Sequence, residues 1–184
     1  MGNIYQLKIT LKDVKPSIWR RIQVKDNLNF LELSTIVQIA MGWEGIHKHM
    51  FVIGDEEIGY TDDDKCDSKD HKIKKYLHKE NTKFIYEYNF GDGWEHDVEV
   101  EAILPIEETK QYPFCIEGKR HCPPENCGGP WAYEDLIGMI KDKKHPDHQK
   151  MIEKFGKNFK PEKFDITEIN SKLLNYKNFI KLLS

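Results

Sequence analysis

The chain has 184 residues with a formal net charge of −3, and it combines 39% hydrophobic with 32% charged residues, including nine Phe, eight Tyr and four Trp. This length is enough for one domain with its own core, and the aromatic content excludes a disordered chain. The acidic balance argues against a protein that holds nucleic acid through phosphate neutralisation alone, because such proteins usually carry a basic face.

Alternating apolar and polar residues predict a β-hairpin at the start of the chain. The alternation runs through residues 4–11 and again through residues 18–24, as expected for half-buried strands. Asp13, Lys15 and Pro16 lie between the two runs and supply turn chemistry. We therefore expect the two strands to pair antiparallel.

A helix is expected after this hairpin. Asn29 and Glu32 have the spacing of a capping box, and an apolar stripe at helical spacing continues to a stop near Gly42. The stripe consists of Leu33, Ile36, Val37 and Ala40. Residues 47–54 return to strand alternation, and a short strand segment follows at residues 58–60.

The clearest hairpin joins residues 83–90 to residues 94–104 through the turn Gly91-Asp92-Gly93. Apolar and polar residues alternate in both runs. His96 falls in line with the apolar positions of the second run, whereas the acidic residues occupy the solvent side. These are Glu95, Asp97, Glu99 and Glu101. The pattern therefore directs the His96 ring into the protein.

The chain becomes helical from Pro130, which suits a first helical turn. An apolar stripe follows, Pro146 opens a second short helix, and a last helix lies within residues 166–183. The stripe consists of Tyr133, Leu136, Ile137 and Ile140. This order of elements predicts an α+β fold with a mixed, largely antiparallel sheet of about five strands, a helix packed after the first hairpin and a helical C-terminal part. We expect one domain over residues 1–184, with residues 130–184 as its mainly helical part.

Three of the four cysteines surround a loop rich in Pro and Gly. Cys122 and Cys127 enclose four residues, at the upper edge of ordinary zinc-ligand spacing, and Cys115 lies seven residues before Cys122. His96 would complete a four-ligand zinc site if the hairpin packs over this loop. The alternative is that the cysteines are buried, unligated thiols in a tight loop.

A second set of residues offers a catalytic metal centre. His47 and His49 form a His-x-His pair, which on a strand places both rings on one face. Together with Asp92 or His96, such a pair supplies the ligands of a catalytic metal, so one alternative is a metal-dependent hydrolase or nuclease. The competing interpretation is a structural pair of histidines whose polar atoms are satisfied by hydrogen bonds.

The sequence predicts a cytoplasmic protein without membrane contact. No apolar run approaches the roughly 20 residues that span a bilayer, and the N-terminus lacks the apolar core of a signal peptide. The cysteines are then expected to be thiols or metal ligands rather than disulfides. Cys66, in a charged loop over residues 61–72, is expected to be an exposed bystander.

Several motifs extend over nearly the whole chain. They are Trp19-Arg20-Arg21, Met41-Gly42-Trp43, His49-Met50-Phe51, the turn from Tyr88 to His96, and the loop-to-helix segment from Cys122 to Glu134. Taken together, they resemble the plasmid pRiA4b ORF-3-like family, some of whose members are labelled as resolvase-like passenger proteins of insertion elements. The resemblance implies an α+β protein associated with plasmids and mobile elements, and it implies no particular activity.

The preferred functional prediction is a non-enzymatic binding or structural module in which the Cys/Pro/Gly loop packs beside the Gly91 hairpin. One rival is the metal-dependent hydrolase or nuclease. Another is a nucleic-acid accessory protein of a mobile element, whose binding would depend on Arg20 and Arg21. The net charge of −3 does not support nucleic acid as the partner.

Overall fold

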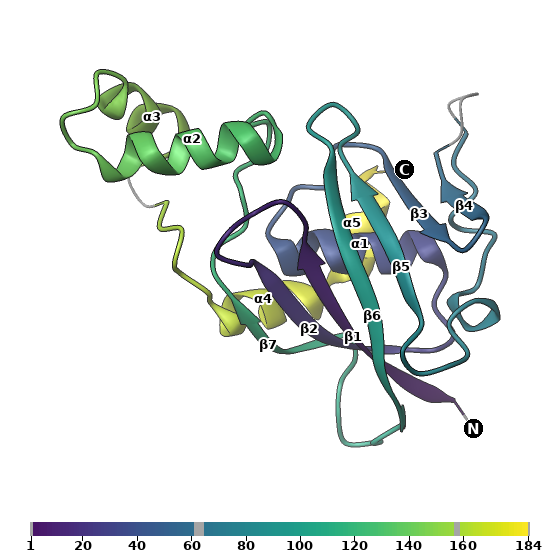
Figure 1. Cartoon of the computed structure of the whole chain (residues 1–184). Coiled ribbons are helices and arrows are strands. Elements are labelled where there is room, and N and C mark those ends of the chain that lie inside the picture. The colour runs from purple at the N-terminus through teal and green to yellow at the C-terminus, as the bar shows by residue number, and fades with distance from the viewer. Residues whose placement is uncertain (1, 61–64, 157–158, 184) are drawn as a thin grey trace.

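One antiparallel sheet is the centre of the fold (Figure 1). The structure is a computed structural model that describes residues 2–60, 65–156 and 159–183. Within these ranges the sheet has seven strands in the order β4-β3-β5-β6-β1-β2-β7, and neighbours pair antiparallel. The strands are β1 (Asn3–Leu11), β2 (Trp19–Lys25), β3 (His49–Ile53), β4 (Glu56–Gly59), β5 (Lys83–Tyr88), β6 (Trp94–Pro105) and β7 (Phe114–Lys119).

Helices cover one face of this sheet. In the described part of the chain they are α1 (Phe30–Met41), α2 (Gly129–Lys141), α3 (His148–Phe155), α4 (Ile166–Leu173) and α5 (Tyr176–Leu183), together with a short 3₁₀ helix, η1 (Ile73–Lys75). α4 and α5 pack beside α1 on the covered face, whereas α2 and α3 pack against each other and project from the sheet (Figure 1). The main core therefore lies between the sheet and α1.

The first hairpin and the first helix form where the sequence predicts them. β1 and β2 pair antiparallel along their length. Asn29 and Glu32 make the reciprocal hydrogen bonds of a capping box, and Gly42 ends α1 with a φ of 99°. α1 is buried around most of its circumference, so its polar residues as well as its apolar stripe face protein.

The β5–β6 hairpin is also confirmed, with Tyr88 opposite Trp94 at its closed end. The Asn89 carbonyl closes the turn by accepting the backbone N–H groups of Asp92 and Gly93 at 2.9 and 2.7 Å. His96 is fully buried on the α1 side, as the alternation predicts. The alternation in β6 holds as far as Val100, beyond which the register with β1 shifts by one residue.

The structure differs from the prediction in the number of strands, which is seven and not about five, and in one helix. β4 matches the short segment predicted at residues 58–60, whereas β7 is not predicted at all. β7 has a single fully buried residue, Cys115, so its alternation is too weak to indicate a strand. Cys115 therefore lies in an edge strand beside β2 and not in a loop. The helix predicted within residues 166–183 is two helices, and residues 61–64 of the predicted charged loop lie outside the described residues.

Polar side chains attach the C-terminal part to the edge of the sheet. Asn170 of α4 accepts the Cys115 N–H at 2.7 Å and donates to the Cys115 carbonyl at 2.9 Å. The buried Arg120 guanidinium forms a bidentate ion pair with the Glu162 carboxylate at 3.0 and 2.9 Å.

None of the helices in the described ranges has the length and apolar character that crossing a bilayer requires.

Candidate functional site

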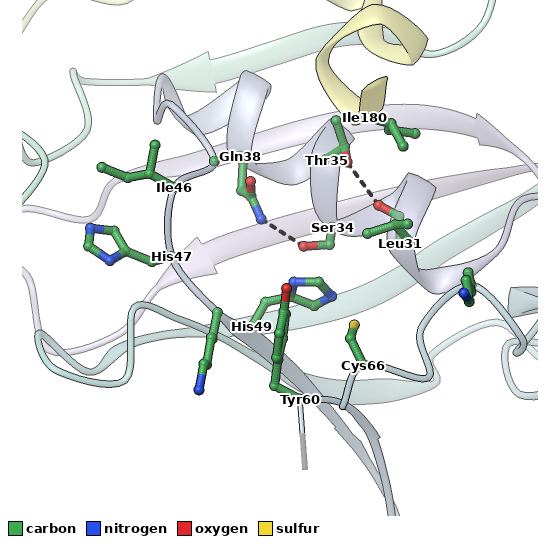
Figure 2. A pocket seen from close by; sticks show the side chains of 13 residues that line it. Leu31, Ser34, Thr35, Gln38, Ile46, His47, His49, Tyr60, Cys66 and Ile180 are labelled. Carbon is green, nitrogen blue, oxygen red and sulfur yellow. Dashed lines mark hydrogen bonds between the residues drawn. The ribbon is translucent and has the colours of Figure 1, made fainter. Parts of the chain in front are cut away.

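A pocket of about 490 Å³ opens between α1, α5 and the edge of the sheet where β3 and β4 meet (Figure 2). Its walls come from α1, the turn at residues 45–48, His49 at the start of β3, Tyr60 and Cys66 beyond β4, and Ile180 of α5. These segments are far apart in sequence, so only the folded chain forms the pocket.

α1 contributes a polar wall to this pocket. Ser34, Thr35 and Gln38 line it, although each is at most 5% exposed. Gln38 Nε2 donates to Ser34 Oγ at 2.8 Å and to the Tyr86 hydroxyl at 3.0 Å, and these two hydroxyls lie 2.9 Å apart. Both amide hydrogens of Gln38 are thereby used. Its amide oxygen has no partner among the described residues and remains an acceptor.

His49 and Cys66 line the pocket beyond this wall (Figure 2). His49 Nε2 lies 2.9 Å from the buried Ser68 hydroxyl. Burial lowers the pKa of His49 to about 4, against a smaller effect of Asp67, so the ring is neutral at pH 7. Cys66 Sγ lies 3.5 Å from the same hydroxyl. The prediction of an exposed bystander is therefore wrong for Cys66, because the chain beyond β4 folds it into a pocket wall.

The rest of the lining is largely apolar. Leu31 of α1 and Ile180 of α5 face the pocket, and Tyr60 adds an aromatic ring (Figure 2). Ile46 also lines the pocket and is 58% exposed, so it is accessible to a molecule entering from solvent. The pocket thus combines apolar surface with a small number of oriented polar groups, which is the usual composition of small-molecule sites.

The side chains of Trp43 and Glu125 connect the cysteine loop, defined as residues 120–128, to this region. Trp43 Nε1 donates to the Pro123 carbonyl at 3.0 Å. Glu125 Oε1 accepts the Tyr88 hydroxyl at 2.9 Å, and Glu125 Oε2 lies 3.6 Å from Nε2 of His47, a residue of the pocket lining. A carboxylate of the cysteine loop therefore reaches the edge of the pocket.

The same loop packs beside the Gly91 hairpin, as predicted. The Gly128 N–H donates to Asp92 Oδ2 at 3.3 Å. Gly129 has a φ of 85°, and a Cβ placed there would lie 2.4 Å from the carbonyl oxygen of Asp92. Only glycine permits this approach, since the backbone atoms of the hairpin cannot yield as a flexible side chain would.

His96 lies in the core and not in the pocket. Its Nδ1 is 3.1 Å from the Tyr86 carbonyl, which only accepts hydrogen bonds, so Nδ1 carries the proton. Nε2 is buried without a partner among the described residues, and the ring meets Trp43 edge to face at 5.3 Å between centroids. Burial lowers the pKa of His96 to about 4, so this ring too is neutral at pH 7.

The structure distributes the predicted zinc ligands over β6, β7 and the cysteine loop. Burial raises the pKa of Cys115 to about 11, that of Cys127 to about 12, and that of Cys122 well above its ordinary value. All three are therefore neutral thiols at pH 7, and all four cysteines are unpaired. In the described ranges, no three His, Cys, Asp or Glu side chains are grouped so that they could hold one metal ion. The zinc site on these cysteines and His96 stays a prediction.

The residues predicted for a catalytic metal fall into three places. His47 and His49 both line the pocket, as their spacing suggests. Asp92 lies at the hairpin turn, where it accepts hydrogen bonds from Gly128 N and Trp94 Nε1, and His96 lies in the core. The hydrolase or nuclease activity also stays a prediction.

The two arginines named for nucleic-acid binding make internal contacts. Arg20 is 2% exposed and donates only to backbone carbonyls. Arg21 forms ion pairs with Glu101 and Glu117. Both guanidinium groups are thus engaged within the protein, and the nucleic-acid role stays a prediction.

The polar wall of α1 is the part of the site that the sequence pattern does not reveal. Ser34 and Gln38 are four residues apart, so they lie on one helix face and adjoin the apolar stripe. This four-residue spacing is the feature of the sequence that could have indicated a polar helix face. Their partner Tyr86 is 48 residues beyond Gln38 and comes from the sheet, so its contribution depends on how α1 packs.

Acid should destabilise the protein through His49 and His96. Both have a pKa of about 4 in the folded state against an ordinary value of 6.5, so the unfolded chain binds more protons between these values. Their contribution to stability is complete above about pH 6.5 and is lost as the pH falls toward 4, by about 3 kcal/mol for each histidine. Urea unfolding across this pH range measures the loss.

Variants of the histidines separate this effect from general acid denaturation. His49→Asn should reduce the pH-dependent loss by the contribution of about 3 kcal/mol assigned to His49, whatever its stability at neutral pH. His78→Asn replaces an exposed histidine and should leave the pH dependence unchanged. An undiminished loss in His49→Asn would show that His49 is not buried in its neutral form.

Known proteins share both the sequence pattern and the fold. The chain matches the family described as plasmid pRiA4b ORF-3-like protein over residues 3–168. It is 33% identical over 161 residues to the uncharacterized protein y4hQ of Sinorhizobium fredii (strain NBRC 101917 / NGR234), which covers 85% of this chain and 82% of that relative. The crystal structure of MM3350, a protein of unknown function from Methanosarcina mazei Go1, is similar with a TM-score of 0.84 at 36% identity and covers 91% of this chain and 98% of that chain. The chain belongs to the plasmid pRiA4b ORF-3-like family.

Proposed function

We propose that this protein is a binding module that takes a small, largely apolar organic molecule with one hydrogen-bond donor into the pocket beside α1. The observation that carries the proposal is the Gln38 amide. Its oxygen accepts no hydrogen bond from a described residue, and Gln38, which is 5% exposed as a residue, lines the pocket. A ligand hydroxyl or N–H group would satisfy this oxygen.

The amide is held in position before any ligand arrives. Ser34 and Tyr86 accept both Gln38 amide hydrogens, so the amide cannot rotate without losing two hydrogen bonds. Because the Gln38 side chain is already fixed, ligand binding costs it little additional conformational entropy. The pocket volume of about 490 Å³ also suits a small organic molecule.

The buried polar groups of the pocket favour binding over acid–base chemistry. Ser34, Thr35 and Gln38 are uncharged, and His49 is neutral at pH 7 with a pKa of about 4. A general acid or base works best with a pKa near the operating pH. These side chains are therefore suited to selecting a ligand by hydrogen bonding.

Phenol and its O-methylated analogue anisole provide matched probes for this proposal. Phenol should bind the protein about fivefold more tightly than anisole, because only phenol donates to the Gln38 oxygen. In Gln38→Met, which keeps the chain length and removes the amide, both compounds should bind equally. Ligand-observed NMR titrations measure the affinities. A preference for phenol that persists in Gln38→Met contradicts the role of the amide.

A second pair of variants tests the location of the site. Ile46 lines the pocket and is 58% exposed, whereas Ile106 is 38% exposed and lies elsewhere. Ile46→Asp should weaken phenol binding severalfold by placing a charge on apolar lining, and Ile106→Asp should not change it. Unchanged binding in Ile46→Asp would move the site away from this pocket.

A further inference from the structure

A second pocket, also of about 490 Å³, lies at the N-terminal end of α1. It is bounded by the end of β2, the first turn of α1, Lys72 beside η1, Tyr112 and Pro113 before β7, and the start of α5. Its lining is mostly polar, in contrast to the pocket beside Gln38, so the two are suited to different ligands.

Three lysines concentrate positive charge in this second pocket. Lys25, Lys72 and Lys177 line it, and none of them forms an ion pair with a described residue. The Lys72 ammonium donates to the Asn27 carbonyl at 3.1 Å. The Lys177 ammonium stands 6.0 Å from the centre of the Tyr176 ring. Their charges are therefore left without an acidic partner in the described part of the protein.

The single carboxylate in the described lining of this pocket is already engaged. Glu32 Oε2 accepts the Asn29 N–H at 3.0 Å in the capping box of α1, and Glu32 Oε1 accepts the Tyr176 hydroxyl at 3.3 Å. The lining therefore carries three ammonium groups and one carboxylate, which gives the pocket a net charge of about +2. This positive charge is local, because the whole chain carries a net charge of −3.

Neutral donors surround the lysines. Asn27, Asn175 and Asn178, whose side-chain amides can donate hydrogen bonds, line the same pocket. The first backbone N–H groups of α5, at Tyr176 and Lys177, have no acceptor within the helix, and the helix end adds a partial positive charge. Ammonium groups and free N–H donors together favour an oxyanion with several acceptor oxygens.

We propose that this second pocket binds the phosphate groups of a polar small molecule. The inference is independent of the ligand proposed for the pocket beside Gln38, because the two pockets share no lining residue. Three lysines from different segments and three asparagines line this one pocket, so ammonium and amide donors are available to the phosphates.

Inorganic pyrophosphate, adenosine diphosphate and adenosine are the probes for this site. The two phosphate compounds should bind the full chain in isothermal titration calorimetry, and adenosine should not. Raising the salt concentration from about 50 to about 200 mM should weaken both severalfold, because the lysines are exposed to solvent. Binding of adenosine as tight as that of the diphosphate would overturn the assignment, as would absent heat with pyrophosphate at low salt.

Lysine variants locate the binding. Lys72→Gln and Lys177→Gln should each weaken pyrophosphate binding by about tenfold through loss of a charge-assisted contact. Lys143→Gln, at an exposed position between α2 and α3, removes the same charge outside the pocket and should have no effect. Circular dichroism should show an unchanged fold in all three variants. An equal loss in Lys143→Gln would mean that only the overall charge attracts the anion and would refute the site.

Discussion

Arg20→Ala should lower the free energy of unfolding by about 3 kcal/mol. The Arg20 side chain is 2% exposed and donates to the carbonyls of Ala40, Trp19 and Lys119 at 2.8, 2.8 and 3.0 Å. Ala40 lies in the last turn of α1, where helix carbonyls lack their usual i+4 donors, and a cation there interacts favourably with the negative end of the helix. Alanine would remove the donor of the Ala40 carbonyl and open a cavity behind β2.

Two further arginine variants test this explanation. Arg20→Lys should restore only part of the stability, because one ammonium cannot replace a planar guanidinium that serves several carbonyls. Arg21→Ala is the control on the same strand, and it should cost about 1 kcal/mol or less because the ion pairs of Arg21 are partly exposed. Urea unfolding at neutral pH measures all three. Equal losses for the two alanine variants would contradict the role of the buried carbonyl contacts.

Gly129→Ala should cost about 3 kcal/mol and loosen the contact between the cysteine loop and the β5–β6 hairpin. Gly129 has a φ of 85°, which disfavours a side chain, and a Cβ would lie 2.4 Å from the Asp92 carbonyl oxygen. Either the hairpin or the start of α2 must move. Hydrogen exchange of the Gly128 N–H, which donates to Asp92, should therefore become faster in this variant.

Gly138→Ala provides the matched control within α2. A Cβ at Gly138 meets no atom within 4 Å, so alanine should stabilise the helix by about 0.5–1 kcal/mol. Urea unfolding should therefore move the two variants in opposite directions. A Gly129→Ala protein as stable as the parent would show that the loop does not need its close approach to the hairpin.

Local patterns predict most of the framework because they depend on residues near one another in the chain. The alternation of β5 and β6 and the turn at residues 91–93 give both the hairpin and the inward direction of His96. The capping box of Asn29 and Glu32 gives the start of α1. β7 is missing from such a prediction, since its pairing with β2 and its contact with Asn170 stabilise a segment with little alternation.

The sequence by itself determines the α+β class, the two hairpins, the capped helix and the motifs of the plasmid pRiA4b ORF-3-like family. Only the tertiary structure decides what the chemically interesting side chains meet. It packs the His96 ring against Trp43, forms a pocket beside Gln38, and brings three lysines from separate segments into the lining of the second pocket. The reason is physical: secondary structure follows from local spacing, whereas burial, pKa and hydrogen-bond partners depend on contacts between residues far apart in the chain.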